Sequence, residues 1–120
     1  MQSSRPSHET LEALWLEQRA LRQAIPEVYQ SFDNLSAEAV ADGALTTKCK
    51  SLIALAIAVV QAHDGAVAAT SKAAVQAGVT AQEAAEAVAV AIMMHGEPAT
   101  VSGARAYAAF CEFEDAVIRP

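Results

Sequence analysis

Four side chains carry groups suited to catalysis or ligand binding: His63, Thr70, His95 and Arg105. His63 lies in the stretch VVQAHDGAVAAT (59–70), where an apolar helix is followed by the start of another. The positive end of a helix disfavours the imidazolium, so we expect a neutral ring, which can serve as a general base. Thr70 follows about two helical turns later and can share a face with His63. The alternative is a partly buried or capping histidine.

The candidates for substrate binding are Arg105 and His95. Arg105 lies among small and apolar residues, where its guanidinium can bind a substrate carboxylate through two hydrogen bonds. It can equally pair with an acidic residue of a neighbouring subunit. His95 ends a predicted helix, where the helix dipole favours its charged form, and a structural role competes with substrate contact. His63, His95 and Glu97 lack the spacing of metal ligands, so neither a metal nor another cofactor is expected.

The two cysteines do not form a redox motif. Cys49 and Cys111 lie far apart in the sequence, and neither belongs to a C-x-x-C pair. In a reducing compartment such residues are typically free and buried. A redox pair formed between them is therefore not favoured.

Composition predicts one all-α domain spanning residues 1–120. The chain is 53% apolar but only 5% aromatic, and much of the apolar share is alanine, the best helix former. Alanine-rich faces let helices approach closely but bury little area each. We therefore expect further burial through contacts between identical subunits.

The charge pattern excludes several classes of partner. The net charge is −6, and no basic patch of the kind that binds nucleic acid is present. The same acidic balance argues against binding to anionic membranes. The longest apolar run, LIALAIAVV, is well short of the roughly 18 residues that span a bilayer. The start, MQSSRPSHET, lacks the apolar region of a signal peptide, so a cytoplasmic protein is expected.

The N-terminal third is predicted to form an amphipathic helix over 8–25 and two short helices before Gly43. The first helix has an apolar stripe at helical spacing, formed by Leu11, Leu14, Trp15, Leu21 and Ile25. Pro26 ends or kinks it. Asn34 and Ser36 indicate a turn and a cap between the two short helices.

Four further helices are predicted. The first begins near Thr46 or Thr47 and is apolar all round, which predicts burial on every side. The second runs from Asp64, the predicted N-cap, to about residue 77. The third opens with the capping box Thr80-Ala-Gln-Glu83 and ends near His95. The last starts at Pro98, and its apolar side is expected to carry Val101, Ala104, Ala108 and Cys111.

These segments, in this order, resemble the carboxymuconolactone decarboxylase-like family, which includes the alkylhydroperoxidase D group. The similar residues are KSLIALAIAVVQ, a turn, and KAAVQAGVTAQEAAEAVAVAIMMHGEPATVSGARAYAAF, within about 40–113. The resemblance implies an all-helical fold built around a helical hairpin, preceded here by N-terminal helices within 8–35. It also implies assembly as a homotrimer or homohexamer. The activities it implies are peroxide reduction at a C-x-x-C-x-x-x-H site, or decarboxylation of a lactone acid by members without the cysteine pair.

The chain departs from this family at the thiol site. Alignment through KAA places the family's two cysteines at His63 and Ala66, its histidine at Thr70, and its glutamate at Ser51. A thiolate at a helix N-terminus is the nucleophile of the thiol chemistry, and none of these residues can replace it. Thiol peroxidase activity is therefore not expected.

Two hypotheses remain open. The first is an enzyme that performs acid–base chemistry around His63 on a small organic acid, with Arg105 holding the carboxylate. A hydroperoxide is the other ligand that the resemblance implies. The second is a non-catalytic oligomeric protein with a binding or structural role. The enzyme predicts a cavity into which His63 points beside another polar group, and the second predicts alanines packed around it.

Overall fold

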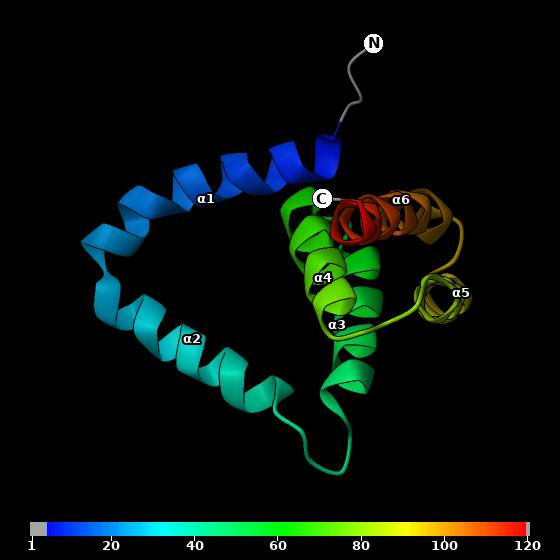
Figure 1. The fold of residues 1–120 in the computed structure, drawn as a ribbon, viewed down its shortest axis with the longest axis horizontal. Coiled ribbons are helices and arrows are strands. Elements are labelled where there is room, and N and C mark those ends of the chain that lie inside the picture. The colour runs from blue at the N-terminus through cyan, green and yellow to red at the C-terminus, as the bar shows by residue number, and fades with distance from the viewer. Residues whose placement is uncertain (1–4, 120) are drawn as a thin grey trace.

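A computed structural model describes residues 5–119, in which six helices follow one another (Figure 1). They are α1 (Pro6–Ala24), α2 (Pro26–Val40), α3 (Thr47–Gln61), α4 (Asp64–Gln76), α5 (Ala81–His95) and α6 (Pro98–Ile118). This part of the chain contains no strand, so the predicted all-α fold is confirmed. None of these six helices combines the length and the apolar character needed to cross a membrane.

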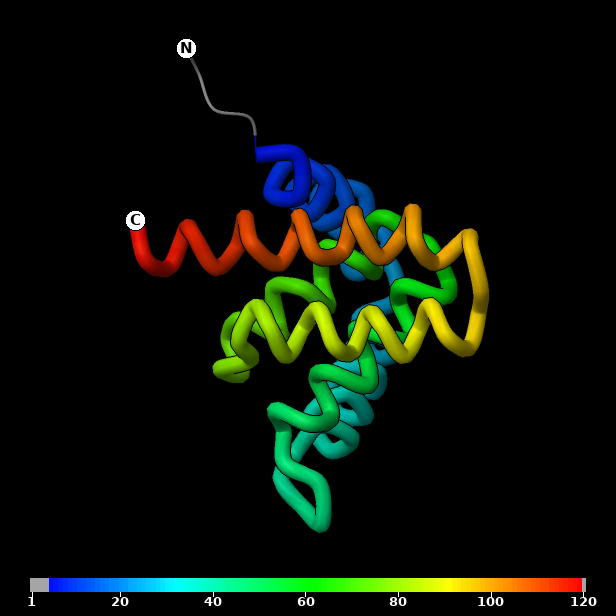
Figure 2. Tube along the Cα trace, turned by 90° about the vertical axis from the view of Figure 1, so that its right-hand side faces the viewer, coloured from blue at the N-terminus to red at the C-terminus, as the bar shows by residue number. Residues whose placement is uncertain are grey.

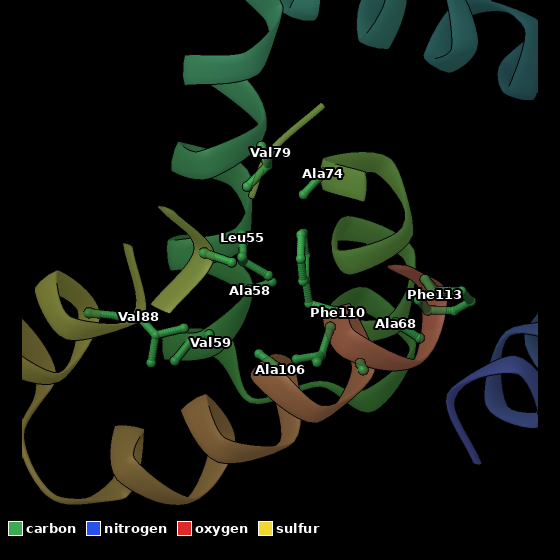
Figure 3. Packing of buried hydrophobic residues seen from close by; sticks show 14 of the residues in the cluster. Leu55, Ala58, Val59, Ala68, Ala74, Val79, Val88, Ala106, Phe110 and Phe113 are labelled. Carbon is green, nitrogen blue, oxygen red and sulfur yellow. The ribbon is translucent and has the colours of Figure 1, made fainter. Parts of the chain in front are cut away.

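The hydrophobic core lies between α3, α4, α5 and α6. Phe110 of α6 is fully buried between Leu55 of α3 and Ala74 of α4 (Figure 3). The antiparallel pair α5 and α6 (Figure 2) approaches closely because Gly103 has no side chain. A Cβ at this glycine would lie 2.6 Å from Cγ1 of Val88. Small residues thus set the spacing between these helices.

Helices α1 and α2 form an arm that projects from this core (Figure 1). The first half of α1 packs on α4 and α6 and buries Leu11. Further along the predicted apolar stripe, Trp15 and Leu21 are each 51% exposed. No residue of α2 is buried. The stripe is therefore a real helix face, but its own chain covers only the first part of it.

The prediction of two short helices before Gly43 is wrong, because α2 runs through both predicted segments without a break. Asn34 and Ser36 lie inside this helix rather than at a turn and a cap. The side-chain amide of Gln30 donates to Oδ1 of Asn34, 3.1 Å away, a contact between neighbouring turns. Asparagine and serine lower helix propensity only slightly, so continuous helix prevails.

Three predictions of burial are also corrected. Ile53 and Ile57 of α3 are about half exposed, because only one side of this helix meets the core. The buried side of α6 is not the predicted stripe; it consists of Ala99, Ser102, Gly103, Ala106, Ala109, Phe110 and Phe113. Cys49 is exposed and Cys111 only half-buried, although both thiols are free.

Candidate functional site

The turn between α3 and α4 carries His63. Ala62 adopts a left-handed conformation, with φ of 56°, which ends α3 and redirects the chain. His63 then extends, and its Nδ1 accepts a hydrogen bond of 3.2 Å from the backbone N–H of Ala66. His63 is thus the N-cap of α4, and the predicted cap, Asp64, is instead the first residue of that helix.

This hydrogen bond assigns the tautomer of His63. A ring nitrogen that accepts from an N–H group is unprotonated, so the neutral imidazole carries its proton on Nε2. Nε2 is then a hydrogen-bond donor. The general-base role expected for His63 would require the cap to break, because Nδ1 is occupied.

The ring of His63 lies over Gly65 rather than in an open cavity. A Cβ built on Gly65 would meet Cε1 of His63 at 3.0 Å and Cδ2 of Leu14 at 3.1 Å. Leu14 belongs to α1, so the arm covers the start of α4. An alanine here would require one of these side chains to move by a few tenths of an ångström.

Ala66 and Thr70, the other positions that the sequence comparison aligned with the thiol relay, lie within the first two turns of α4. Ala66 is partly buried against the core. The hydroxyl of Thr70 donates to the carbonyl oxygen of Ala66, 2.8 Å away, one turn earlier in α4. Thr70 therefore interacts with its own backbone, and no described hydrogen bond links it to His63.

A mostly apolar cleft with an ion pair at its edge opens beside this turn. Arg105 of α6 brings Nη1 to 3.5 Å from Oδ1 of Asp64, and both side chains are about two-thirds exposed. The cleft has a volume of about 260 Å³ and is lined by Pro6, Ser7, Thr10, Asp64, Val67, Ala68, Arg105, Ala108 and Ala109. A long and exposed ion pair contributes little to stability. A ligand carboxylate can therefore replace Asp64 as the partner of Arg105.

Glu112 of α6 fixes the part of α1 that covers the cleft. Its carboxylate accepts from the backbone N–H groups of Ser7 at 3.0 Å and His8 at 2.8 Å, and it also contacts Nδ1 of His8. The ring of His8 packs on Phe113, with 4.4 Å between the ring centroids. Burial alone would raise the pKa of Glu112, but the hydrogen bonds from His8 and Ser7 outweigh it and lower the pKa below its usual value.

His95 and Glu97 do not join this site through any described hydrogen bond or ion pair. His95 is exposed at the end of α5, beside Gly96, whose φ is 92°. Within residues 5–119, no three histidine, cysteine, aspartate or glutamate side chains gather as a metal site would require. Sequence reasoning missed the roles of Asp64 and Glu112. The partner of Asp64 lies 41 positions away in the sequence, and the partners of Glu112 lie more than 100 positions away.

Comparison with known proteins gives one consistent result. The model of the carboxymuconolactone decarboxylase family matches residues 26–116. The crystal structure of a carboxymuconolactone decarboxylase family protein from Legionella pneumophila, without ligand, is similar over 92% of this chain and 99% of that chain. The two are 32% identical, with a TM-score of 0.89. None of the curated proteins matches.

Proposed function

Because the chain belongs to the carboxymuconolactone decarboxylase family, we propose that it binds a small organic acid in the cleft beside the start of α4 and acts on it without thiol chemistry. The observation that carries this proposal is the position of Arg105, 3.5 Å from Asp64 at the edge of a cleft of about 260 Å³. This cleft adjoins the turn that holds the thiol site in the family's peroxidase members.

The cleft has the donors that a carboxylate needs. The guanidinium of Arg105 can bind both oxygens of a carboxylate at once. The start of α4 adds the positive end of a helix dipole. Ser7 and Thr10 line the same cleft and offer hydroxyl groups from α1. Asp64 lines the same cleft and repels an anion, so binding requires these donors to outweigh its charge. The modest volume excludes a large ligand.

His63 precedes Asp64 at the edge of the cleft without lining it, and its hydrogen bonding favours acid rather than base chemistry. Its Nε2–H is free to donate while Nδ1 caps α4. In a decarboxylation, the electron pair of the breaking C–C bond moves towards a conjugated carbonyl oxygen as carbon dioxide leaves. A donor beside that oxygen stabilises the resulting enolate. A hydroperoxide is the less favoured substrate, because Ala66 has no sulfur with which to resolve an oxidised thiol.

The test is a calorimetric titration of the full chain with a panel of small mono- and dicarboxylates. We expect at least one to bind, and Arg105→Gln to weaken it roughly 10- to 100-fold, as loss of a charged hydrogen bond does. Arg119→Gln is the matched control, because Arg119 is exposed at the end of α6. Absence of binding across the panel, or equal binding by Arg105→Gln, would contradict the proposal.

The second candidate is a non-catalytic oligomer on the same scaffold. The position of the exposed His63 ring beside Gly65 favours it, because this side chain does not line the cleft. Proton NMR of each bound acid over hours distinguishes the two. An acid converted by the wild-type chain and left unchanged by His63→Ala supports the enzyme, and an acid that binds without conversion supports the second candidate.

A further inference from the structure

The cleft beside the start of α4 presents one charged group of each sign. The guanidinium of Arg105 and the carboxylate of Asp64 both line it, with 3.5 Å between their nearest atoms. Within residues 5–119, neither side chain forms a second ion pair. A ligand with only a carboxylate gains from Arg105 but is repelled by Asp64, so it leaves one of the two groups unmatched.

The ion pair itself leaves room for a ligand at both groups. Arg105 and Asp64 are 65% and 69% exposed, whereas Lys48 and Glu83 approach to 3.0 Å and are about 40% exposed. A long and exposed ion pair contributes little to stability, so opening it costs little. A ligand that offers a new partner to each charge therefore gains two charged contacts and gives up one weak one.

We infer that the ligand of this cleft is zwitterionic: a small acid with an ammonium group close to its carboxylate, in the class of the aliphatic α-amino acids. The inference rests on the proposed function, because the carboxylate remains the group that Arg105 binds. The ammonium group then lies beside Asp64. In an α-amino acid both groups are attached to the same carbon atom, so they can engage two side chains that already lie side by side.

The rest of the cleft fits the remaining part of such a ligand. Val67 and Ala68 of α4 and Ala109 of α6 line the cleft and are buried apolar residues. They offer apolar contact to an aliphatic side chain, which gains from leaving water. The volume of about 260 Å³ lies just below the range of about 300–1,000 Å³ that accommodates drug-sized molecules. A small aliphatic side chain therefore suits this cleft better than a large or polar one.

The charge of the whole chain also favours a zwitterion over an anion. The net charge is −6, which repels a free anion as it approaches. A zwitterion has no net charge at pH 7 and is not subject to this repulsion. Its two charges act only at close range, where Arg105 and Asp64 can distinguish them.

The experiment is a calorimetric titration of the full chain with pairs of ligands that differ only in the ammonium group: free L-valine against isovalerate, and free L-alanine against propionate. The amino acid should bind about tenfold or more tightly than its partner, as one added charged hydrogen bond allows. Isovalerate should bind measurably but more weakly. L-valinamide, which keeps the ammonium group and lacks the carboxylate, should also bind more weakly than L-valine.

Replacing Asp64 locates the ammonium group. In Asp64→Asn the preference for L-valine over isovalerate should fall to about threefold or less, and isovalerate itself should bind more tightly, because the repelling charge is gone. Asp115→Asn is the matched control, since Asp115 is an exposed aspartate that pairs with Arg119 at 3.7 Å outside the cleft. It should keep the wild-type preference. Circular dichroism checks that each variant is folded, and Asp64→Ser replaces Asp64→Asn if it is not.

The possible results separate this inference from the proposed function. Plain acids that bind through Arg105 while the amino acids bind no more tightly would overturn the zwitterion and leave the proposed function standing. A preference for amino acids that persists in Asp64→Asn would also overturn it, because the ammonium group would then lie elsewhere. A wild type that binds neither series would contradict both.

Discussion

His63 shows how one side chain can preserve a turn while its chemistry changes. The family's peroxidase members need a thiolate at this helix N-terminus, and here a ring nitrogen accepts the hydrogen bond from Ala66 instead. The position still satisfies a backbone N–H that would otherwise lack a partner. The cap is by itself a structural reason for a histidine at this position.

Replacing His63 tests the cap directly. We expect His63→Ala to lower the free energy of unfolding by about 1 kcal/mol, the usual effect of losing an N-cap side chain. His63→Asn should stay within a few tenths of the wild type, because asparagine caps well. Urea denaturation followed by circular dichroism measures both. An alanine variant as stable as the wild type would mean that the side chain does not cap α4.

Glu112 predicts a pH dependence. Its hydrogen bonds from His8 and Ser7 outweigh burial and lower its pKa in the folded state. The carboxylate therefore stabilises the fold above its ordinary pKa of 4.5, and this contribution is lost as the pH falls through the lower folded value. Glu112→Gln should cost about 1–2 kcal/mol at pH 7.

Urea denaturation between pH 7 and pH 3 measures the free energy of unfolding of the wild type and of Glu112→Gln. The difference between wild type and Glu112→Gln should shrink as the pH falls below about 4.5. Glu38→Gln on the exposed α2 is the control and should match the wild type at neutral pH. A difference that stays constant down to pH 3 would refute the carboxylate's role.

At the scale of the elements, local signals located helix ends better than helix faces. The capping box at Thr80 and the N1 position of Pro98 occur as predicted, because they depend on residues within one turn. The buried side of α6 was misassigned because the predicted stripe began at Val101 and continued through small residues, whereas Phe110 and Phe113 lie on the opposite side with Gly103 and Ala106. In an alanine-rich helix several faces are apolar, so the apolar pattern alone does not reveal which face is buried.

Gly103 tests this account of the spacing between α5 and α6. Gly103→Ala places a Cβ 2.6 Å from Cγ1 of Val88, so the Val88 side chain or one of the two helices must shift. We expect a cost of about 1–3 kcal/mol from overpacking, although alanine is the better helix former. Val88→Ala combined with Gly103→Ala should recover part of this loss, as thermal unfolding of the two variants will reveal. A Gly103→Ala variant more stable than the wild type would show that a Cβ fits between α5 and α6 without cost.

At the scale of the whole molecule, the scaffold could be predicted from the sequence and the site only in part. The order of apolar helix, turn, KAA and glycine turn resembles the family, and the match over residues 26–116 confirms it. The pairing of Arg105 with Asp64 and the capping of α1 by Glu112 could not be predicted. Both join helices that are distant in the sequence, and their relative placement follows from packing rather than from any local motif.

The most direct measurement is hydroperoxide reduction with a dithiol donor, for the native chain and for Cys49→Ser/Cys111→Ser. Because positions 63 and 66 carry histidine and alanine rather than cysteine, we predict no turnover above the uncatalysed rate in either. Cys49 is exposed and free, so its thiol is accessible to a hydroperoxide and the measurement can contradict this prediction. Turnover by the native chain that vanishes without the cysteines would contradict it, and would mean that thiol chemistry has moved to a new position on this scaffold.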